Sequence, residues 1–171
     1  MATLAELSRL GTGLSTQQLQ HLQRLVAWWG ILADLSFSDL LLFVPVDEAG
    51  GEFAIASQIR PTTGQTLYQD DHVGLRVSDI DRPLVASAYG RAGVIEGEVP
   101  IKPSNRRASV MCIPIRYEDQ VIGVLSRELL PNFAERRDPG ELERTYLEAF
   151  HQLAKMIAVG TFPYQDDEVD L

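Results

Sequence analysis

Two short apolar runs separated by a polar break form the clearest pattern in the chain. Residues 110–115 and 121–125 are rich in Val, Ile, Met and Leu, whereas residues 116–120 contain the turn-forming pair Glu118-Asp119. This pattern predicts a β-hairpin. Neither run alternates between apolar and polar positions, so we expect other parts of the fold to cover both faces of these strands.

A second hairpin is predicted nearer the N-terminus. Residues 39–46 are almost continuously apolar, residues 47–52 include two glycines in a polar stretch, and residues 53–59 return as a second apolar run. Strands bounded in this way by turn residues are typical of antiparallel pairing.

The stretch between the two hairpins has a weaker pattern. Residues 65–77 predict a loop with at most a short strand, and residues 82–90 predict a short helix with Asp81 as its cap and Pro83 in its first turn. We expect a further short strand within residues 93–99 and a basic loop over residues 100–107.

Long amphipathic helices are predicted near both ends. Ser15 and Gln18 match a capping box at the start of residues 15–33. Two neighbouring apolar stripes run along this helix: Leu19, Leu22, Val26, Trp29 and Ala33, and beside them Leu25, Trp28 and Leu32. Residues 138–159 predict the last helix, with Asp138 as its cap and Gly160 as its stop.

Strands between terminal helices predict an α+β fold with a central antiparallel sheet. We expect the two long helices on one face of the sheet, and the short helix with the loops on the other. The expected organisation is an N-terminal arm over residues 1–13, one domain over residues 14–160, and the start of an acidic linker over residues 161–171.

Composition and charge narrow the functional classes. The net charge of −9 over 171 residues argues against nonspecific binding to nucleic acid or to an anionic membrane. The single cysteine, Cys112, excludes an internal disulfide, and the three scattered histidines lack metal-ligand spacing. The longest apolar run, residues 40–46, is far shorter than the ~18 residues of a membrane span. No signal peptide is apparent, so we expect a cytoplasmic protein.

Several segments resemble one known family. The closing hairpin looks like that of a GAF domain, a small-molecule sensing and dimerisation module. More specifically, the segments LADLSFSD (32–39), RPTTG (60–64) and MIAVGTFPY (156–164) resemble a family of cytosolic actinobacterial sensor histidine kinases. Their GAF-like domain is followed by PAS and kinase modules, so the resemblance implies a sensor segment placed before both. The chain has no phosphoacceptor or ATP-binding motif, and we expect no kinase activity from it alone.

Candidate ligand contacts lie in the loops and the short helix, although each has a plainer interpretation. They are Arg60, Tyr68, His72, Tyr89, Arg107 and Cys112. The arginines, with Lys102 and Arg106, would bind an anion or lie in solvated loops, whereas the tyrosines would stack on a flat ligand or cover the core. His72 would face a pocket beside Tyr68 or lie in solvent. Cys112 sits in an apolar strand, which favours a buried thiol over a reactive one.

The function that these observations favour is ligand-dependent signalling through the terminal helices. A third apolar stripe runs along the last predicted helix: Leu142, Tyr146, Phe150, Leu153 and Ile157. We expect a homodimer whose interface includes Leu25, Trp28, Leu32, Tyr146 and Phe150, because the three stripes exceed what one sheet face can bury. The alternatives are a purely structural dimerisation domain and a GAF-fold enzyme such as a methionine sulfoxide reductase, which a single cysteine disfavours. The sequence names no cofactor, catalytic residue or metal site.

Overall fold

The computed structural model describes residues 11–47, 49–62, 66–68, 70–101, 106–130 and 140–164. A curled six-stranded sheet has the strand order β3-β2-β1-β6-β5-β4, and every neighbouring pair is antiparallel. The strands are β1 Asp39–Pro45, β2 Glu52–Ile59, β3 Arg76–Ser78, β4 Ile95–Ile101, β5 Arg106–Tyr117 and β6 Gln120–Leu129. The helices are α2 Thr16–Ala27, α3 Trp29–Ser36, α4 Pro83–Arg91 and α6 Glu141–Val159. The predicted α+β fold is confirmed.

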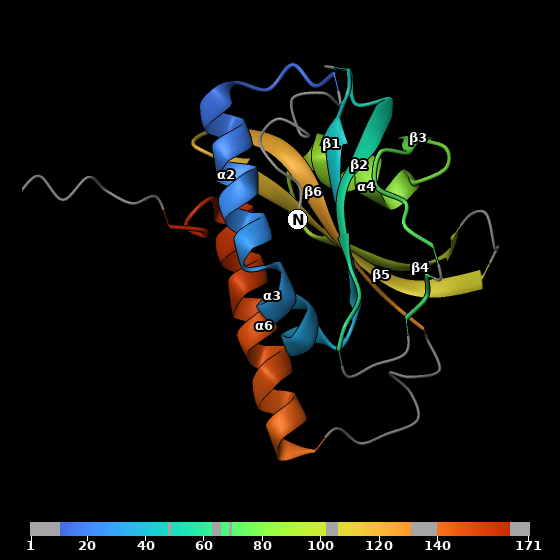
Figure 1. Ribbon diagram of the computed structural model, residues 1–171, viewed down its shortest axis with the longest axis vertical. Helices are drawn as coiled ribbons and strands as arrows, with labels where there is room; N and C mark the ends of the chain where they lie inside the picture. The colour runs from blue at the N-terminus through green and yellow to red at the C-terminus, as the bar shows by residue number, and fades with distance from the viewer. Residues whose placement is uncertain are drawn as a thin grey trace, which may run out of the picture.

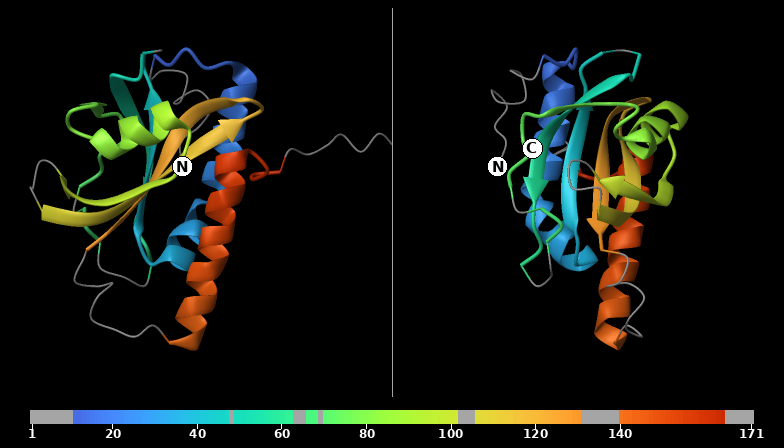
Figure 2. Two further views of the ribbon diagram at one scale, coloured as in Figure 1. Left: turned by 180° about the vertical axis from the view of Figure 1, so that it is seen from behind. Right: turned by 90° about the vertical axis from the view of Figure 1, so that its right-hand side faces the viewer.

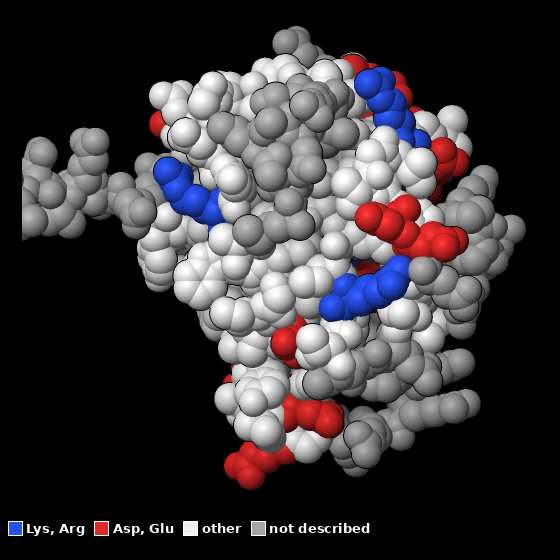
Figure 3. Space-filling model, in the orientation of Figure 1, with Lys and Arg blue, Asp and Glu red and all other residues white. Residues whose placement is uncertain are grey.

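The helices cover the sheet as the sequence predicts. Helices α2, α3 and α6 lie along one face, whereas α4 and the segment around β3 lie on the other (Figures 1 and 2). Acidic and basic side chains are mixed on the face shown in Figure 3, and acidic ones gather at the end where α6 begins. Glu141 and Glu143 lie in the first turn of that helix, where the helix dipole favours negative charge.

The predicted closing hairpin is formed by β5 and β6. Tyr117 pairs with Gln120 across the turn Glu118-Asp119, and Glu118 adopts a left-handed conformation with a φ of 54°. Strand β6 lies between β1 and β5, and its Val124 and Leu125 are both fully buried. Burial on both faces explains why the two runs do not alternate. Gly123 lets β6 approach β1 closely, because a Cβ there would lie 2.9 Å from the Phe43 carbonyl oxygen.

Alternate side chains of the strands form two cores. Leu40, Leu42 and Leu125 belong to the core under α2, α3 and α6, which also contains Phe150, Ala154 and Ile157 of α6. Leu41, Phe43 and Val124 belong to the core under α4. Strand β6 therefore contributes directly to both cores, and any shift of this strand is felt on both faces of the sheet.

The predicted helix over residues 15–33 is two helices. Its capping box is confirmed, since Ser15 and Gln18 exchange both hydrogen bonds. The first helix ends at Ala27, with Trp28 as its C-cap. The Trp28 backbone N–H donates to the Leu25 carbonyl at 3.0 Å, and this i→i+3 hydrogen bond tightens the last turn of α2. Helix α3 then starts at Trp29 and buries Trp29, Leu32 and Ala33, whereas 45% of the Trp28 surface remains exposed.

Two further boundaries differ from prediction. The N-cap of α4 is Arg82 rather than Asp81, because the Asp81 backbone N–H bonds to Ser78 Oγ in the preceding turn. Pro83 does occupy the first turn of α4. At α6 the N-cap is Gly140, and the predicted cap Asp138 lies outside the described residues. Gly160 ends α6 with a φ of 90°, as its type predicts.

Candidate functional site

A buried polar cluster lies between the sheet and the segments that cover its α4 face. It consists of Tyr68, Arg82 and Glu128, which are 5%, 8% and 0% exposed. The Arg82 guanidinium and the Tyr68 hydroxyl both donate to the Glu128 carboxylate, and Arg82 Nη2 donates to Tyr68 Oη at 3.0 Å. We call this group the Tyr68–Arg82–Glu128 cluster. Each member comes from a different part of the chain, so the cluster ties residue 68, the start of α4 and strand β6 together.

Further polar groups on β6 and on its neighbours β5 and β1 extend the cluster. Ser126 Oγ donates to Glu128 Oε1 at 3.0 Å, and the Cys112 thiol lies 3.8 Å from Ser126 Oγ. Asp39 pairs with Glu128 in the register of β1 and β6 and is also buried. Two buried carboxylates therefore share this end of the sheet. The Arg82 guanidinium pairs with Glu128, and the charge of Arg60 acts on Asp39.

Separate donors satisfy the Asp39 carboxylate. Thr66 Oγ1 and the Leu67 backbone N–H each donate to it at 2.7 Å. Burial raises the pKa of Asp39 above its ordinary value, although these two hydrogen bonds act in the opposite direction. Asp39 thereby anchors the short segment 66–68 that carries Tyr68.

The electrostatics of the site disfavour nucleophilic catalysis by Cys112. Burial raises the pKa of the Cys112 thiol to about 12, so the thiol stays protonated near neutral pH. Burial, followed by the nearby Glu128 carboxylate, also raises the pKa of Tyr68, which keeps its hydroxyl a hydrogen-bond donor. The described residues contain no group of three or more His, Cys, Asp or Glu side chains suited to a metal ion.

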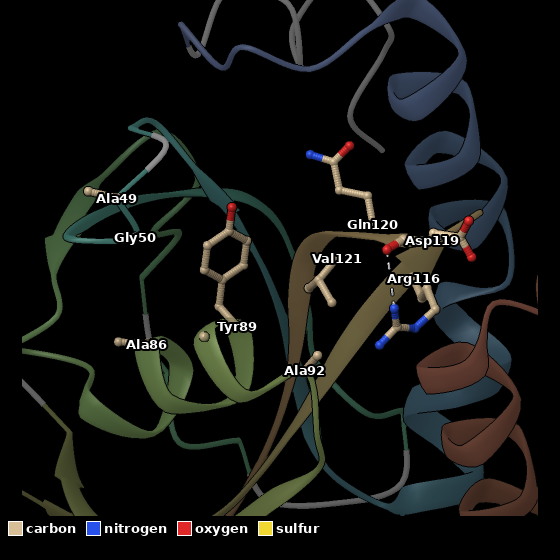
Figure 4. Close-up of a pocket in the computed structure, with 10 residues that line it drawn as sticks. Ala49, Gly50, Ala86, Tyr89, Ala92, Arg116, Asp119, Gln120 and Val121 are labelled. Atoms are coloured by element: carbon tan, nitrogen blue, oxygen red, sulfur yellow. Dashed lines mark hydrogen bonds between the residues drawn. The ribbon is translucent and has the colours of Figure 1, made fainter.

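A surface hollow lies near the other end of α4. It has a volume of about 420 Å³ and is bordered by Tyr89 of α4, by Arg116 and Val121 of the closing hairpin, and by the β1–β2 turn (Figure 4). Tyr89 packs edge-on against Phe53, with ring centroids 5.5 Å apart. The hollow thus lies between α4 and the closing hairpin.

Comparison with known proteins identifies the family. A profile described as "Histidine kinase PdtaS, GAF domain" matches residues 4–150. The chain belongs to this GAF domain family. It is 37% identical over 172 residues to the sensor histidine kinase PdtaS of Mycobacterium tuberculosis strain H37Rv, covering 98% of this chain and 33% of that protein. The PdtaS of Mycolicibacterium smegmatis is 34% identical over 166 residues, covering 95% of this chain and 32% of that protein.

Solved structures agree with this assignment. The structure titled "Sensor region of a sensor histidine kinase" has a TM-score of 0.77 and 36% identity, and the match covers 96% of this chain and 56% of that one. The GAF-B domain of DevS from Mycobacterium smegmatis shares the fold, with a TM-score of 0.52 and 18% identity over 80% of this chain and 88% of that chain. The GAF domain described here spans about one third of the length of its curated PdtaS relatives. Among its described residues, no helix is long and apolar enough to span a membrane.

The GAF domain brings three of the six predicted ligand contacts together. Tyr68 belongs to the cluster, the His72 ring lies edge-on to Tyr68 with centroids 5.1 Å apart, and Cys112 reaches the cluster through Ser126. The other three lie elsewhere. Tyr89 borders the hollow near the end of α4, and Arg60 borders a separate hollow with Gln58 and Asp71. Arg107 is 64% exposed beside Glu98.

The sequence interpretation missed two members of the cluster, Arg82 and Glu128, and two polar residues beside it, Asp39 and Ser126. One signal for them was available. Ser126 and Glu128 follow the apolar run 121–125 at strand spacing, which places them on a covered face of a central strand. A charge at such a position requires a buried partner.

Most of the predicted dimer contacts are core residues of the single chain, so that part of the prediction is wrong. Leu25, Leu32 and Phe150 are at most 1% exposed and pack in the core under the long helices. Both stripes of the N-terminal segment pack into this core, except at Trp28. Only Trp28 and Tyr146 remain accessible, at 45% and 38%.

Proposed function

We propose that this GAF domain is the sensory input domain of a cytoplasmic histidine kinase, preceding the PAS and kinase modules of the parent protein. The cluster on the α4 face acts as its switch, and α6 carries the signal onward. The observation that supports this most is the position of Glu128 in β6. Glu128 bonds the segments that cover one face of the sheet, while Leu125, three residues earlier in the same strand, packs into the core shared with α6 on the other face. Membership of the PdtaS GAF family supports the signalling role.

The cluster has the chemistry of a two-state element. Its ion pair is buried, so breaking the pair without a replacement is costly, whereas exchanging one partner for another is not. A small molecule that presents its own acceptor to Arg82, or its own donor to Glu128, would substitute for one internal contact. It would shift the population only if it bound the two arrangements with different affinity.

Strand β6 is linked to α6 through a shared core and through β5. Ser126 and Glu128 lie at the cluster, whereas Leu125 belongs to the same buried core as Phe150, Ala154 and Ile157. Strand β5, which pairs with β6, packs directly against α6. Packed cores transmit small displacements because they cannot deform continuously. A change at Glu128 therefore reaches the end of α6, the helix nearest to the following modules.

Dimerisation is the second candidate role, and exposed apolar side chains support it. Trp28 and Ile31 near the start of α3, with Leu142 and Tyr146 of α6, are 38% to 64% exposed on the helical face. A symmetric pair of such faces would bury them. An enzymatic role gains no support, since Cys112 is buried and protonated.

A domain exchange tests the proposed function. This chain replaces the homologous third of M. tuberculosis PdtaS, and autophosphorylation of the chimera is followed with labelled ATP. We expect an active chimera whose rate changes about fivefold in Tyr68→Phe, because one hydrogen bond in the cluster is worth ~1 kcal/mol. The control Tyr164→Phe removes the same hydroxyl from a ring that is 67% exposed and should leave the rate unchanged. An inactive chimera, or equal rates in the two variants, would contradict the proposal.

A further inference from the structure

The hollow beside α4 is distinct from the Tyr68–Arg82–Glu128 cluster. Arg82 and Tyr89 lie at opposite ends of α4, and in Figure 4 the Tyr89 ring and the Arg116 side chain lie on either side of Val121. Small residues from the β1–β2 turn and from α4 form much of the remaining lining: Ala49, Gly50, Ala86, Gly90 and Ala92. The volume of about 420 Å³ falls within the range of small-molecule sites.

Arg116 gives the hollow a specific binding group. Its Nε donates to the Ala158 carbonyl at 3.2 Å, and Nη1 donates to the Asp119 carbonyl at 3.4 Å, so both acceptors are neutral. Among the described residues, no carboxylate lies within ion-pair distance of this guanidinium. Asp119 also borders the hollow, but its side chain points away from Tyr89 (Figure 4). The remaining N–H groups of Arg116, which donate to none of the described residues, suit the two oxygens of a carboxylate.

Tyr89 and its surroundings supply a flat apolar wall. The ring is held edge-on against Phe53, and Gly50 leaves room for it, because a Cβ at Gly50 would lie 3.0 Å from the Tyr89 ring. A planar group would stack on this ring while its charged end reaches Arg116. We propose that the hollow binds a small aromatic carboxylate, with the carboxylate on Arg116 and the ring against Tyr89.

The same arginine connects this hollow to the end of α6. Strand β4 pairs with β5 from Arg106 to Cys112, and a bulge between Ile115 and Arg116 follows in the β5–β6 ladder. Arg116 thus borders a hollow on the α4 side and also bonds Ala158 in the last turn of α6. Gly160 is pressed against it as well, since a Cβ there would lie 3.2 Å from the Arg116 carbonyl oxygen.

Ligand binding would therefore alter the end of α6. A carboxylate bound by the remaining Nη groups draws the Arg116 guanidinium toward the hollow, because a charged acceptor bonds more strongly than a neutral one. This movement stretches the hydrogen bond from Arg116 Nε to the Ala158 carbonyl. The last turn of α6 and Gly160 then lose a restraint. Only the signalling meaning of this change rests on the proposed function, whereas binding in the hollow is independent of it.

NMR titration of the 15N-labelled 171-residue chain tests the proposal. The probes are benzoate, the uncharged isostere benzamide, and inorganic phosphate. We expect benzoate to shift the amides of Tyr89, Val121 and Gly160 along one saturating curve. Benzamide and phosphate should bind at least about tenfold more weakly, because one lacks the charge and the other lacks the ring.

Two variants show whether Arg116 is responsible. Arg116→Gln should weaken benzoate binding about tenfold, and Arg116→Lys, which keeps the charge without the planar fork, should also weaken it. The control Arg91→Gln removes an exposed charge next to the hollow and should leave the affinity unchanged.

Several results would overturn the proposal. Absence of saturable benzoate shifts in the hollow, or equal binding of benzoate and benzamide, would exclude a carboxylate site. Tighter binding of phosphate would indicate a general anion site, and unchanged binding in a folded Arg116→Lys would exclude the arginine fork. Shifts confined to the hollow, without Gly160, would overturn the link to α6. The kinase chimera reports on Tyr68, so its failure would leave these binding results unaffected.

Discussion

The buried ion pair between Arg82 and Glu128 offers a quantitative test of the cluster. Glu128→Gln keeps the shape of the side chain but leaves the Arg82 guanidinium, which is 8% exposed, without a counter-charge. Arg82→Met leaves the Glu128 carboxylate buried next to Asp39. Each single substitution should lower the free energy of unfolding by about 3–5 kcal/mol, the usual cost of an uncompensated buried charge.

The double variant decides whether the two effects share one cause. Arg82→Met with Glu128→Gln removes both charges, so we expect it to cost less than the sum of the single variants by about 2 kcal/mol or more. Urea unfolding followed by circular dichroism gives the free energies of unfolding of wild type, the two single variants and the double variant. The dependence of that free energy on urea concentration should have the same slope in all four proteins.

An exposed ion pair provides the matched control. Arg107 Nη2 and Glu98 Oε2 lie 3.9 Å apart, and the two side chains are 64% and 48% exposed. Arg107→Met with Glu98→Gln should show a coupling below about 0.5 kcal/mol. Additive losses at Arg82 and Glu128, or a coupling no larger than that of the control pair, would refute the assignment of a buried, mutually compensating pair.

Three further predictions follow from other parts of the fold. Leu125→Ala should cost about 2–5 kcal/mol in urea unfolding, because Leu125 is fully buried in the central strand, and a loss below ~0.5 kcal/mol would contradict that placement. Burial, with the charge of Arg24, lowers the pKa of His21 from 6.5 to about 4. As the pH falls, His21 therefore binds a proton in the unfolded chain before it does so in the folded chain. The free energy of unfolding should fall by roughly 3 kcal/mol as the pH drops from 6.5 to 4. An equal fall in His21→Leu would contradict this cause. In sedimentation at micromolar concentration we expect a dimer that Trp28→Glu dissociates and the control Ile80→Glu, on an 85% exposed side chain, does not; a monomeric wild type would contradict dimerisation.

Local patterns predicted most of the architecture. The apolar run 121–125 lacks alternation because β6 is covered on both faces, and the turn Glu118-Asp119 carries its own conformational signal. The break at Trp28 left no such trace, because the apolar positions continue at helical spacing through it. Packing against the sheet decides that geometry, and the same packing buries Leu25 and Leu32 that were expected at a dimer interface.

The candidate site was harder to predict, because its chemistry is assembled by the fold. Tyr68, Arg82 and Glu128 are far apart in the sequence, and each type is common on protein surfaces. Only the position of Glu128 after a buried run indicated that a counter-charge must come from elsewhere. The three-dimensional arrangement alone identifies this partner as Arg82, which lies at the start of the helix predicted over residues 82–90.

Hydrogen exchange measured by mass spectrometry most directly tests whether the cluster and the end of α6 share one equilibrium. Tyr68→Phe is compared with wild type and with Gln20→Gly, which destabilises an exposed position of α2 by about 1 kcal/mol without touching the cluster. The quantity compared is the ratio of the exchange rate at residues 154–160 to that of the slowest amides of the sheet. We expect Tyr68→Phe to raise this ratio about fivefold, and we expect Gln20→Gly to leave it unchanged. Faster exchange confined to residues 66–68 and the start of α4, or the same ratio in both variants, would contradict a coupling between the two faces.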